Sequence, residues 1–389
     1  IRVMHICVVA EGYPFAHRAY FTFVKQLCVA MADLGIRVSV IVPQSITKSI
    51  VRKVPIAPKY RREKTAKGNY VDIYSPRIIS LGQLGTKGGF KHFNSFWFSR
   101  SVCKVVEKFE NKPDVLYGHF WHSAYAVYPV AKKYKIPLFV ASGEAEIELH
   151  HNYSHEHLRE FIAYIKGVIC VSTKNKNESV NARLATMDKC IVIPNAIDVS
   201  LFHKKDKDKL RDQFGISPTD FVVAFVGGFI YRKGANRVAM AIQQLDDPTI
   251  KSIFIGKLMG QNSTDLPECN GIIFRGPLSH DKVADYLNCA DVFVMPTLHE
   301  GCCNANIEAL ACGLPIISSD RDFNYDILDS SCAILVDPMD VNDIANAILY
   351  LKTHLLERQR MSDNAFEKSK SYHITTRVKL IVNYISSCL

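Results

Sequence analysis

The chain has 389 residues, of which 48% are hydrophobic and 22% charged, so its composition excludes wholesale disorder and its length exceeds one ordinary domain. The formal net charge is +10, but residues 1–195 carry 28 basic and 14 acidic side chains, against 20 and 24 in residues 196–389. Residues 48–112 alone carry 15 basic and 4 acidic side chains, which predicts either an anionic partner or a solvated basic face there.

Short apolar segments alternate with helical patterns along the whole chain. The strands expected in the first half are Val3–Ala10, Val38–Pro43, Tyr70–Tyr74, Val115–Tyr117, Leu138–Ala141, Val168–Val171 and Ile191–Ile193. Those expected in the second half are Phe221–Val226, Ile253–Ile255, Ile272–Phe274, Val292–Met295, Ile316–Ser318 and Ala333–Val336. Helical patterns between them include Ala19–Leu34, Asp281–Cys289 and Asn342–Lys352. This alternation predicts an α/β fold with two doubly wound parallel sheets.

The domain boundary is expected near Pro194–Phe202, where a strand ends and a charged stretch begins a helix. The first domain then takes residues 1–198 and the second takes residues 199–370. The segment Thr375–Ser387 has apolar residues at helical spacing and follows the last strand, so residues 371–389 are expected to complete the first domain. Ser45–Gly89 is rich in Lys, Arg, Pro and Gly, which is typical of a long functional excursion.

Three further observations bear on location. The longest apolar runs, such as Val222–Val226, fall far short of the ~20 residues that a membrane helix needs. The stretch Ile1–Ala10 lacks the small-residue cleavage site of a signal peptide, and the 12 cysteines form no CxxC pair. We therefore expect a cytoplasmic protein with reduced thiols.

The strongest local signal lies between Pro296 and Pro315. A buried strand ends there in a loop that contains Gly301, and a helix begins for which Asn304 is a plausible N-cap. Unpaired N–H groups at a helix start favour an anion, and the carboxylates of Glu300 and Glu308 bracket this turn. On spacing alone, an ordinary strand–loop–helix unit explains the pattern equally well.

A second signal is the segment Val226–Gly234, which also follows a strand and opens a helix. Its pair Gly227-Gly228 and its cations Arg232 and Lys233 suit a diphosphate, because they combine close backbone approach with point charge. Ligands of doubly wound sheets collect at the carboxyl ends of the strands, where both signals lie.

Residues 222–338 resemble the donor domain of the retaining nucleotide-sugar glycosyltransferases of family 4, which have the GT-B architecture of two Rossmann-like domains facing a cleft. Glu300 to Glu308 matches the family's E-x7-E motif, and Arg232-Lys233-Gly234 matches its diphosphate loop. Pro194–Asp198 is similar to its hinge motif, and Asp114–His119 resembles a strand end of its first domain.

The resemblance implies a role for each matching residue. Glu300, His119 and Lys233 would be the catalytic residues, with Glu300 on the donor sugar, His119 on the transferring sugar or its acceptor, and Lys233 on the leaving diphosphate. Glu308 would accept hydrogen bonds from the ribose. The remaining donor-binding positions would be Gly12, Gly228, Arg232, Arg275, Gly301, Cys302, Cys303 and Asn304. No cofactor and no metal would be required.

Three segments depart from the family pattern. Gly227-Gly228 stands where the family usually has Gly-Arg, and Cys302-Cys303 stands where it usually has Phe-Pro. Ala141–Glu144 replaces the His-Gly-Ser-Asp of many members. These departures imply a changed sugar or acceptor specificity rather than a changed diphosphate chemistry.

Two weaker patterns lie in the first half. Four histidines cluster between His150 and His157 beside glutamates, and we read them as a solvated loop over the acceptor cleft rather than a metal site. Phe90, Phe93 and Trp97 share one helical face among basic residues, which fits either a membrane interface or a core face, with core slightly favoured for Phe96 and Trp97.

Taken together, these patterns predict a retaining, metal-independent glycosyltransferase. It would move a sugar from a nucleotide-diphosphate sugar to a hydroxyl of a glycan or lipid-linked acceptor in surface polysaccharide synthesis. Residues 48–112 would meet an anionic membrane surface at the inner face of the cell membrane. The alternatives are a sugar-nucleotide epimerase on the same fold and a non-catalytic protein that binds anionic ligands or nucleic acid. Nucleic acid is disfavoured because the basic residues form no recognition motif.

Overall fold

The computed structural model describes residues 3–16, 21–51, 53–81, 89–258 and 264–389. The start of the helix expected at Ala19, the basic residue Arg52 and residues 82–88 of the expected excursion lie outside this description. Contacts divide the chain into two compact units. The first comprises Ile1–Val171, Asn175–Ile193 and Val378–Leu389, and the second comprises Ser172–Lys174 and Pro194–Arg377.

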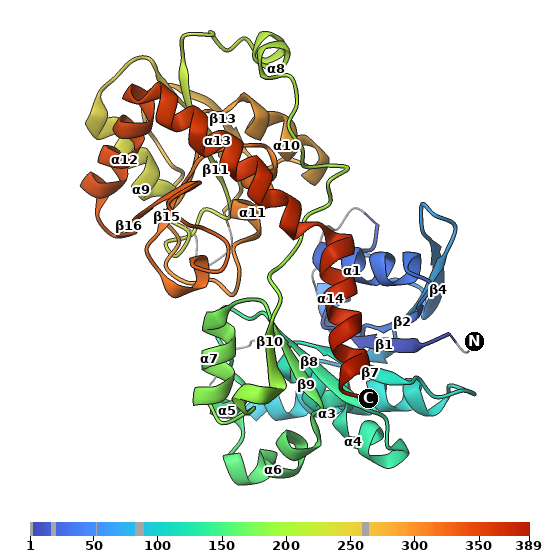
Figure 1. Cartoon of the computed structure of the whole chain (residues 1–389). Coiled ribbons are helices and arrows are strands. Elements are labelled where there is room, and N and C mark those ends of the chain that lie inside the picture. Colours follow the sequence, from blue (N-terminus) through green and yellow to red (C-terminus); the bar gives the residue numbers. More distant parts are fainter. Residues whose placement is uncertain (1–2, 17–20, 52, 82–88, 259–263) are drawn as a thin grey trace. The chain divides into compact units, whose positions relative to one another are not determined.

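The first unit is built on an eight-stranded sheet with the order β10-β9-β8-β7-β1-β2-β5-β4 (Figure 1). All neighbours are parallel except β4 and β5. The strands are β1 (His5–Val9), β2 (Arg37–Ile41), β4 (Tyr60–Lys64), β5 (Tyr70–Tyr74), β7 (Val115–His119), β8 (Leu138–Ser142), β9 (Gly167–Cys170) and β10 (Cys190–Val192), and β3 (Gln44–Ser45) pairs separately with β6 (Arg77–Ile78). Every strand expected in this half is present.

Helices cover both faces of this sheet. They are α1 (Thr22–Asp33), α2 (Ile46–Val51), α3 (Gly89–Glu107), α4 (Trp121–Tyr134), α5 (Leu149–Asn152), α6 (His155–Tyr164), most of α7 (Thr173–Asn181) and the end of α14 (Ile374–Ser387). In β8, Leu138 and Val140 lie in the core shared with α3 and α4. Phe139 points to the opposite face, where its ring lies 6.3 Å from that of Tyr384 in α14. The C-terminal helix therefore packs on the first sheet, as expected.

The prediction that Ser45–Gly89 is a long excursion was wrong for its middle part. β4 forms an antiparallel pair with β5 and adds an edge strand to the sheet. The guanidinium of Arg62 donates two hydrogen bonds to Asp72, at 2.7 and 3.1 Å. Most side chains of β4 are charged, so the strand contains no apolar run and the sequence pattern did not indicate it. Such charges are typical of edge strands because they oppose aggregation.

The second unit is a six-stranded parallel sheet with the order β13-β12-β11-β14-β15-β16. Its strands are β11 (Phe221–Val226), β12 (Ile250–Ile255), β13 (Ile272–Gly276), β14 (Val292–Met295), β15 (Ile316–Ser319) and β16 (Ala333–Val336). Its helices are α8 (Lys207–Phe214), α9 (Ala235–Leu245), α10 (His280–Cys289), α11 (Asn304–Ala311), α12 (Val341–Thr353) and α13 (Leu355–Ser369). Both units are doubly wound Rossmann-like folds, as the sequence predicted.

The strand order locates the switch point of each sheet. In the second sheet the connections run one way from β11 to β12 and the other way to β14, so the loops after β11 and β14 lie next to each other. In the first sheet the same reversal separates β1 from β7. A crevice outside the strand ends at such a point is where open α/β sheets bind ligands.

Candidate active site

The loop after β11 holds Gly228, Arg232 and Lys233 and ends at Gly234, which precedes α9. Gly234 has a φ of 82°, a left-handed conformation that glycine adopts without strain. The end of β12 approaches this loop so closely that a Cβ on Gly256 would lie 1.9 Å from the carbonyl oxygen of Gly227. The absence of a side chain at Gly256 thus lets the ends of β11 and β12 come together.

Lys233, Arg232 and Glu300 form one cluster at the switch point. The Lys233 Nζ donates to Glu300 Oε1, and the Arg232 guanidinium donates to the same oxygen at 2.9 Å. Buried Thr297 donates a third hydrogen bond to it, also at 2.9 Å. Glu300 is only 9% exposed, so its charge is balanced by these donors rather than by water. The sequence predicted the three charged residues as a site, and the structure brings them into contact.

The loop that follows Glu300 offers backbone donors. Gly301, Cys302 and Cys303 are buried, and within the described part of the chain their N–H groups have no hydrogen-bond acceptor. Burial raises the pKa of the Cys302 thiol to about 11 and that of Cys303 to about 12, so both stay protonated near neutral pH. The loop therefore presents polar N–H groups and uncharged thiols.

Asn304 is not the N-cap of α11, contrary to the sequence interpretation. Cys303 occupies that position, and Asn304 is the first helical residue. The side chain of Asn304 instead accepts a hydrogen bond from Asn195 Nδ2 at 2.8 Å, and Arg377 donates to Asn195 at 2.6 Å. The prediction failed because the side chain of Asn304 makes this longer-range contact instead of capping the helix.

A buried amide network fixes α11 beneath the site, and sequence reasoning missed it. Asn306 Nδ2 donates to Ser318 Oγ at 3.2 Å and to Asn324 Oδ1 at 3.1 Å. Ser318 in turn donates to the carbonyl oxygen of Met295 at 2.9 Å. All three polar side chains are fully buried, so the network holds the helix start in one position over β14 and β15. The sequence signal for this network is Asn306 itself, an asparagine on an otherwise apolar helix face.

Glu308 lies one turn further along α11. Its Oε1 accepts a hydrogen bond from His280 Nε2 at 3.1 Å, and this bond raises the pKa of the imidazole despite its partial burial. His280 is the first residue of α10, which follows β13. No sequence motif marked it, since it approaches Glu308 only through the fold. The pair therefore joins a carboxylate of α11 to a titrating partner at the start of α10.

The His280–Glu308 pair predicts a pH-dependent contribution to stability. Because the folded pKa of His280 lies above its ordinary value, the pair stabilises fully below about pH 6.5 and loses its contribution as pH rises through the folded pKa. We expect His280→Gln to lower the free energy of unfolding by at most about 1 kcal/mol at pH 5.5, and by less at pH 8.5. Urea unfolding at both pH values measures this, and an equal loss at both would contradict it.

Arg275 and Gly228 complete the predicted donor-binding set in this unit. Arg275 lies within β13 rather than after it, and its guanidinium donates to Glu268 and, at 2.8 Å, to the carbonyl oxygen of Pro267. Its charge is thus already engaged by neighbouring residues. Gly228 accepts a hydrogen bond from the Ile230 N–H at 2.9 Å, which closes the loop before Arg232.

Gly12 and His119 lie in the first unit, at the switch point of its sheet. Gly12 is buried in the loop after β1, and His119 is the last residue of β7 and only 8% exposed. The imidazole of His119 packs against the rings of Phe23 and Phe120, with centroids 5.2 and 4.6 Å apart. Phe120 has a φ of 78°, a strained conformation for a non-glycine residue that is typical of functional sites.

Glu144 holds the start of α4 beside His119. Its carboxylate accepts hydrogen bonds from the N–H groups of Trp121, at 2.7 Å, and Gly143, at 2.9 Å. Burial nevertheless raises the pKa of Glu144 to about 7. This carboxylate stands where the resemblance implied a changed contact, and it serves as the cap of α4.

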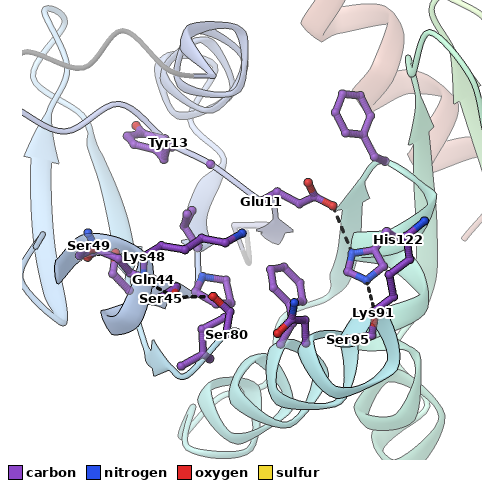
Figure 2. Close-up of a pocket in the computed structure, with 18 of the residues that line it drawn as sticks. Glu11, Tyr13, Gln44, Ser45, Lys48, Ser49, Ser80, Lys91, Ser95 and His122 are labelled. Carbon is purple, nitrogen blue, oxygen red and sulfur yellow. Dashed lines mark hydrogen bonds and ion pairs between the residues drawn. The ribbon is translucent and has the colours of Figure 1, made fainter. Parts of the chain in front are cut away.

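A pocket of about 790 Å³ opens in the first unit next to these residues (Figure 2). Gly12 lines it, together with Glu11 and His122. His122 Nδ1 lies 3.1 Å from Glu11 Oε1, and its Nε2 lies 3.1 Å from Ser95 Oγ. This hydrogen bond with His122 lowers the pKa of Glu11. The loop after β1, α3 and α4 thus contribute one hydrogen-bonded chain to the pocket wall.

Three properties of the described residues concern metal binding, membrane-spanning helices and disulfides. No group of three or more His, Cys, Asp or Glu side chains in that part of the chain is arranged to hold a metal ion. The cluster between His150 and His157 therefore forms no such group there. Among the same residues, no helix is both long and apolar enough to cross a bilayer. All twelve cysteines are free.

Comparison with known proteins gives two family matches. Residues 21–201 match the family described as Glycosyltransferase Family 4, and residues 206–368 match the one described as Glycosyl transferases group 1. A relative from Bacillus subtilis (strain 168), named as a teichuronic acid biosynthesis glycosyltransferase, TuaC, is 25% identical over 87% of this chain and 86% of its own length. A D-inositol 3-phosphate glycosyltransferase of Paenarthrobacter aurescens is 22% identical over 69% and 71%.

Solved structures agree on the architecture. Sucrose-phosphate synthase from Thermosynechococcus elongatus superposes with a TM-score of 0.77 at 18% identity, over 99% of this chain and 100% of that one. Anabaena Alr3699/HepE, solved in complex with UDP and glucose, gives 0.70 at 17% identity over the same shares. With two matching models that together span most of the sequence and with the GT-B fold of its structural neighbours, this chain belongs to the glycosyltransferases of family 4.

Proposed function

We propose that this glycosyltransferase is a retaining enzyme that moves a sugar from a nucleotide-diphosphate sugar to a hydroxyl of a glycan or lipid-linked acceptor in surface polysaccharide synthesis. The observation that carries the proposal is the contact of Lys233 and Arg232 with Glu300 at the switch point of the second sheet. Two cations and the N–H groups of Gly301 to Cys303, which have no acceptor among the described residues, suit a leaving diphosphate. The names of TuaC and of the UDP complexes of HepE support a polysaccharide setting and a UDP-sugar donor.

In this mechanism the chain supplies position and charge. Lys233 and Arg232 neutralise the diphosphate as its bond to the sugar breaks, and the carboxylate of Glu300 holds sugar hydroxyls at the reacting carbon. Glu308 accepts hydrogen bonds from the ribose. Each group is fixed before the reaction by the contacts described above, which lowers the cost of reorganisation during transfer.

A donor screen tests the proposal directly. We expect UDP-sugars to raise the melting temperature more than GDP-, ADP- or TDP-sugars, and transfer to yield a product with the anomeric configuration of the donor. Product analysis with and without acceptor separates transfer from epimerisation of the donor. Inverted configuration, or a new nucleotide sugar formed without acceptor, would contradict the proposal.

A metal requirement gives a second test. Because the cations of Lys233 and Arg232 already stand where a divalent ion would neutralise the diphosphate, we expect EDTA to leave turnover unchanged within about twofold. The measurement is nucleoside diphosphate release with saturating donor and acceptor, before and after chelation. Strict dependence on Mg²⁺ or Mn²⁺ would overturn this assignment.

The peripheral membrane location remains part of the proposal. Two apolar side chains of α2 lie at the surface: Ile50 is 69% exposed and Val51 is 82% exposed. The exposed Lys53 lies close to them in the sequence. Such a mixture suits an anionic membrane surface. Arg61 and Arg62 do not contribute freely, because both are engaged in ion pairs with Glu63 and Asp72.

The aromatic face of α3 divides between core and surface. Trp97 packs against the core of the first unit, whereas Phe96 is 58% exposed, so the expectation that Phe96 is a core residue was wrong. The side chain of Phe90 lies outside the described residues. The exposed ring of Phe96 therefore needs another explanation.

A further inference from the structure

A second hollow of the first unit shares part of its lining with the polar pocket of Figure 2. This hollow has a volume of about 470 Å³, and we call it the aromatic groove because Phe96, Tyr125, Tyr128 and Tyr153 line it. Ser95, His122 and Tyr153 line both the groove and the polar pocket. The two hollows therefore lie next to each other at His122.

The polar pocket does not concentrate the positive charge of residues 48–112. Four carboxylates line it, against three cations. One cation, Arg61, donates to Glu63 and stacks on Tyr13, and a second, Lys91, lies 3.7 Å from Glu148. The charge of the third, Lys48, helps to lower the pKa of Glu11, a carboxylate of the same pocket. The remaining wall is rich in hydroxyl and amide groups, namely Gln44, Ser45, Ser49, Ser80, Asn94 and Ser95. Such a wall suits an uncharged ligand with many hydroxyls more closely than a phosphate.

The aromatic groove combines ring faces with polar rims. Tyr125 is hydrogen-bonded to His157 Nε2 at 2.7 Å, and the rings of Tyr153 and His157 stack 5.3 Å apart. Tyr128 and Glu160 lie on the same wall. The C–H face of a sugar ring packs favourably on electron-rich aromatic faces, while its hydroxyls bond to imidazole and carboxylate rims. A lipid tail would desolvate those rims without giving them partners.

We propose that the first unit binds the acceptor as an uncharged oligosaccharide, with the terminal sugar in the polar pocket and the preceding sugar on the aromatic groove. This inference rests on the proposed function, since it names the class of acceptor. The hydrogen-bonded chain Glu11–His122–Ser95 stands at the junction and positions the terminal sugar. The enzyme is therefore a chain-extending one that discriminates by acceptor length.

Phe96 offers a matched test. It is exposed in the groove on α3, whereas Phe93 of the same helix is 37% exposed and lines neither hollow. We measure binding by calorimetry without donor, using glucose, galactose and N-acetylglucosamine, their di- and trisaccharides, glucose 1-phosphate and farnesyl phosphate. At least one trisaccharide is expected to bind about tenfold more tightly than its monosaccharide. Phe96→Ala is expected to weaken binding of that trisaccharide about three- to tenfold, and Phe93→Ala is expected to leave it unchanged.

Three outcomes would overturn the proposal. One is that no trisaccharide binds more tightly than its monosaccharide. Another is that Phe96→Ala and Phe93→Ala behave alike. The third is that glucose 1-phosphate or farnesyl phosphate binds more tightly than every neutral sugar. Binding is read without donor, so it is independent of the proposed transfer. Release of UDP from UDP-glucose in the presence of the bound trisaccharide tests transfer separately.

Discussion

Replacing Lys233 by methionine is expected to lower the turnover number by about two to three orders of magnitude, while the Kd for the donor changes far less. Lys233 Nζ contacts Glu300 Oε1 at the switch point of the second sheet. Charge on the leaving diphosphate grows as the sugar bond breaks, so a cation fixed there stabilises the transition state more than the bound donor. Single-turnover transfer and donor calorimetry measure the two quantities.

The control for this substitution is Lys205→Met in the same unit. Lys205 is 28% exposed and pairs with Asp285 at 2.7 Å, which resembles the 20% exposure and ion pair of Lys233. Both variants lose one partly buried ion pair, but only one loses it at the proposed diphosphate site. Arg232 and Thr297 still contact Glu300 in Lys233→Met, so thermal unfolding should differ little between the variants. Equal turnover numbers for the two variants would contradict the assignment of Lys233 to the leaving diphosphate.

Most of the fold could be predicted from the sequence because the strands of the two sheets follow a simple apolar pattern. Central strands such as β11 and β14 are buried on both faces and appear as short apolar runs between helical segments. β4 was missed for the opposite reason: Tyr60–Lys64 is an edge strand with four charged residues, and only pairing with β5 reveals it. Local apolar pattern therefore predicts central strands well and edge strands poorly.

The candidate site divides in the same way. Glu300, Glu308 and Lys233 stand at fixed spacings within strand–loop–helix units, so the sequence marks them. His280, Thr297 and Asn306 carry no motif, and their importance follows from contacts made after folding. Asn304 is the opposite case: its side chain is suited to cap a helix, but it bonds to Asn195 instead. Spacing predicts which residues reach a loop, but it does not predict their partners.

Replacing Glu308 by alanine is expected to weaken the binding of UDP by about 10- to 100-fold, the range for losing hydrogen bonds to a charged acceptor. Glu308 keeps one carboxylate oxygen beyond the one that His280 contacts, so a ribose hydroxyl can share the group. Alanine suits the helix α11, and the side chain of Glu308 is 16% exposed, so the fold should survive. Isothermal calorimetry with UDP gives the change in Kd.

A ligand lacking the hydroxyls separates a ribose contact from a general disturbance of the site. In the unaltered protein, UDP should bind more tightly than its 2′,3′-dideoxy analogue, whereas Glu308→Ala should bind the two about equally. His280→Gln supplies the matched control, because it removes the partner of Glu308 but leaves the carboxylate available to the ribose. That variant should keep the preference for UDP. If Glu308→Ala also keeps it, the carboxylate does not meet the ribose, and the lost affinity must come from a shift of α11.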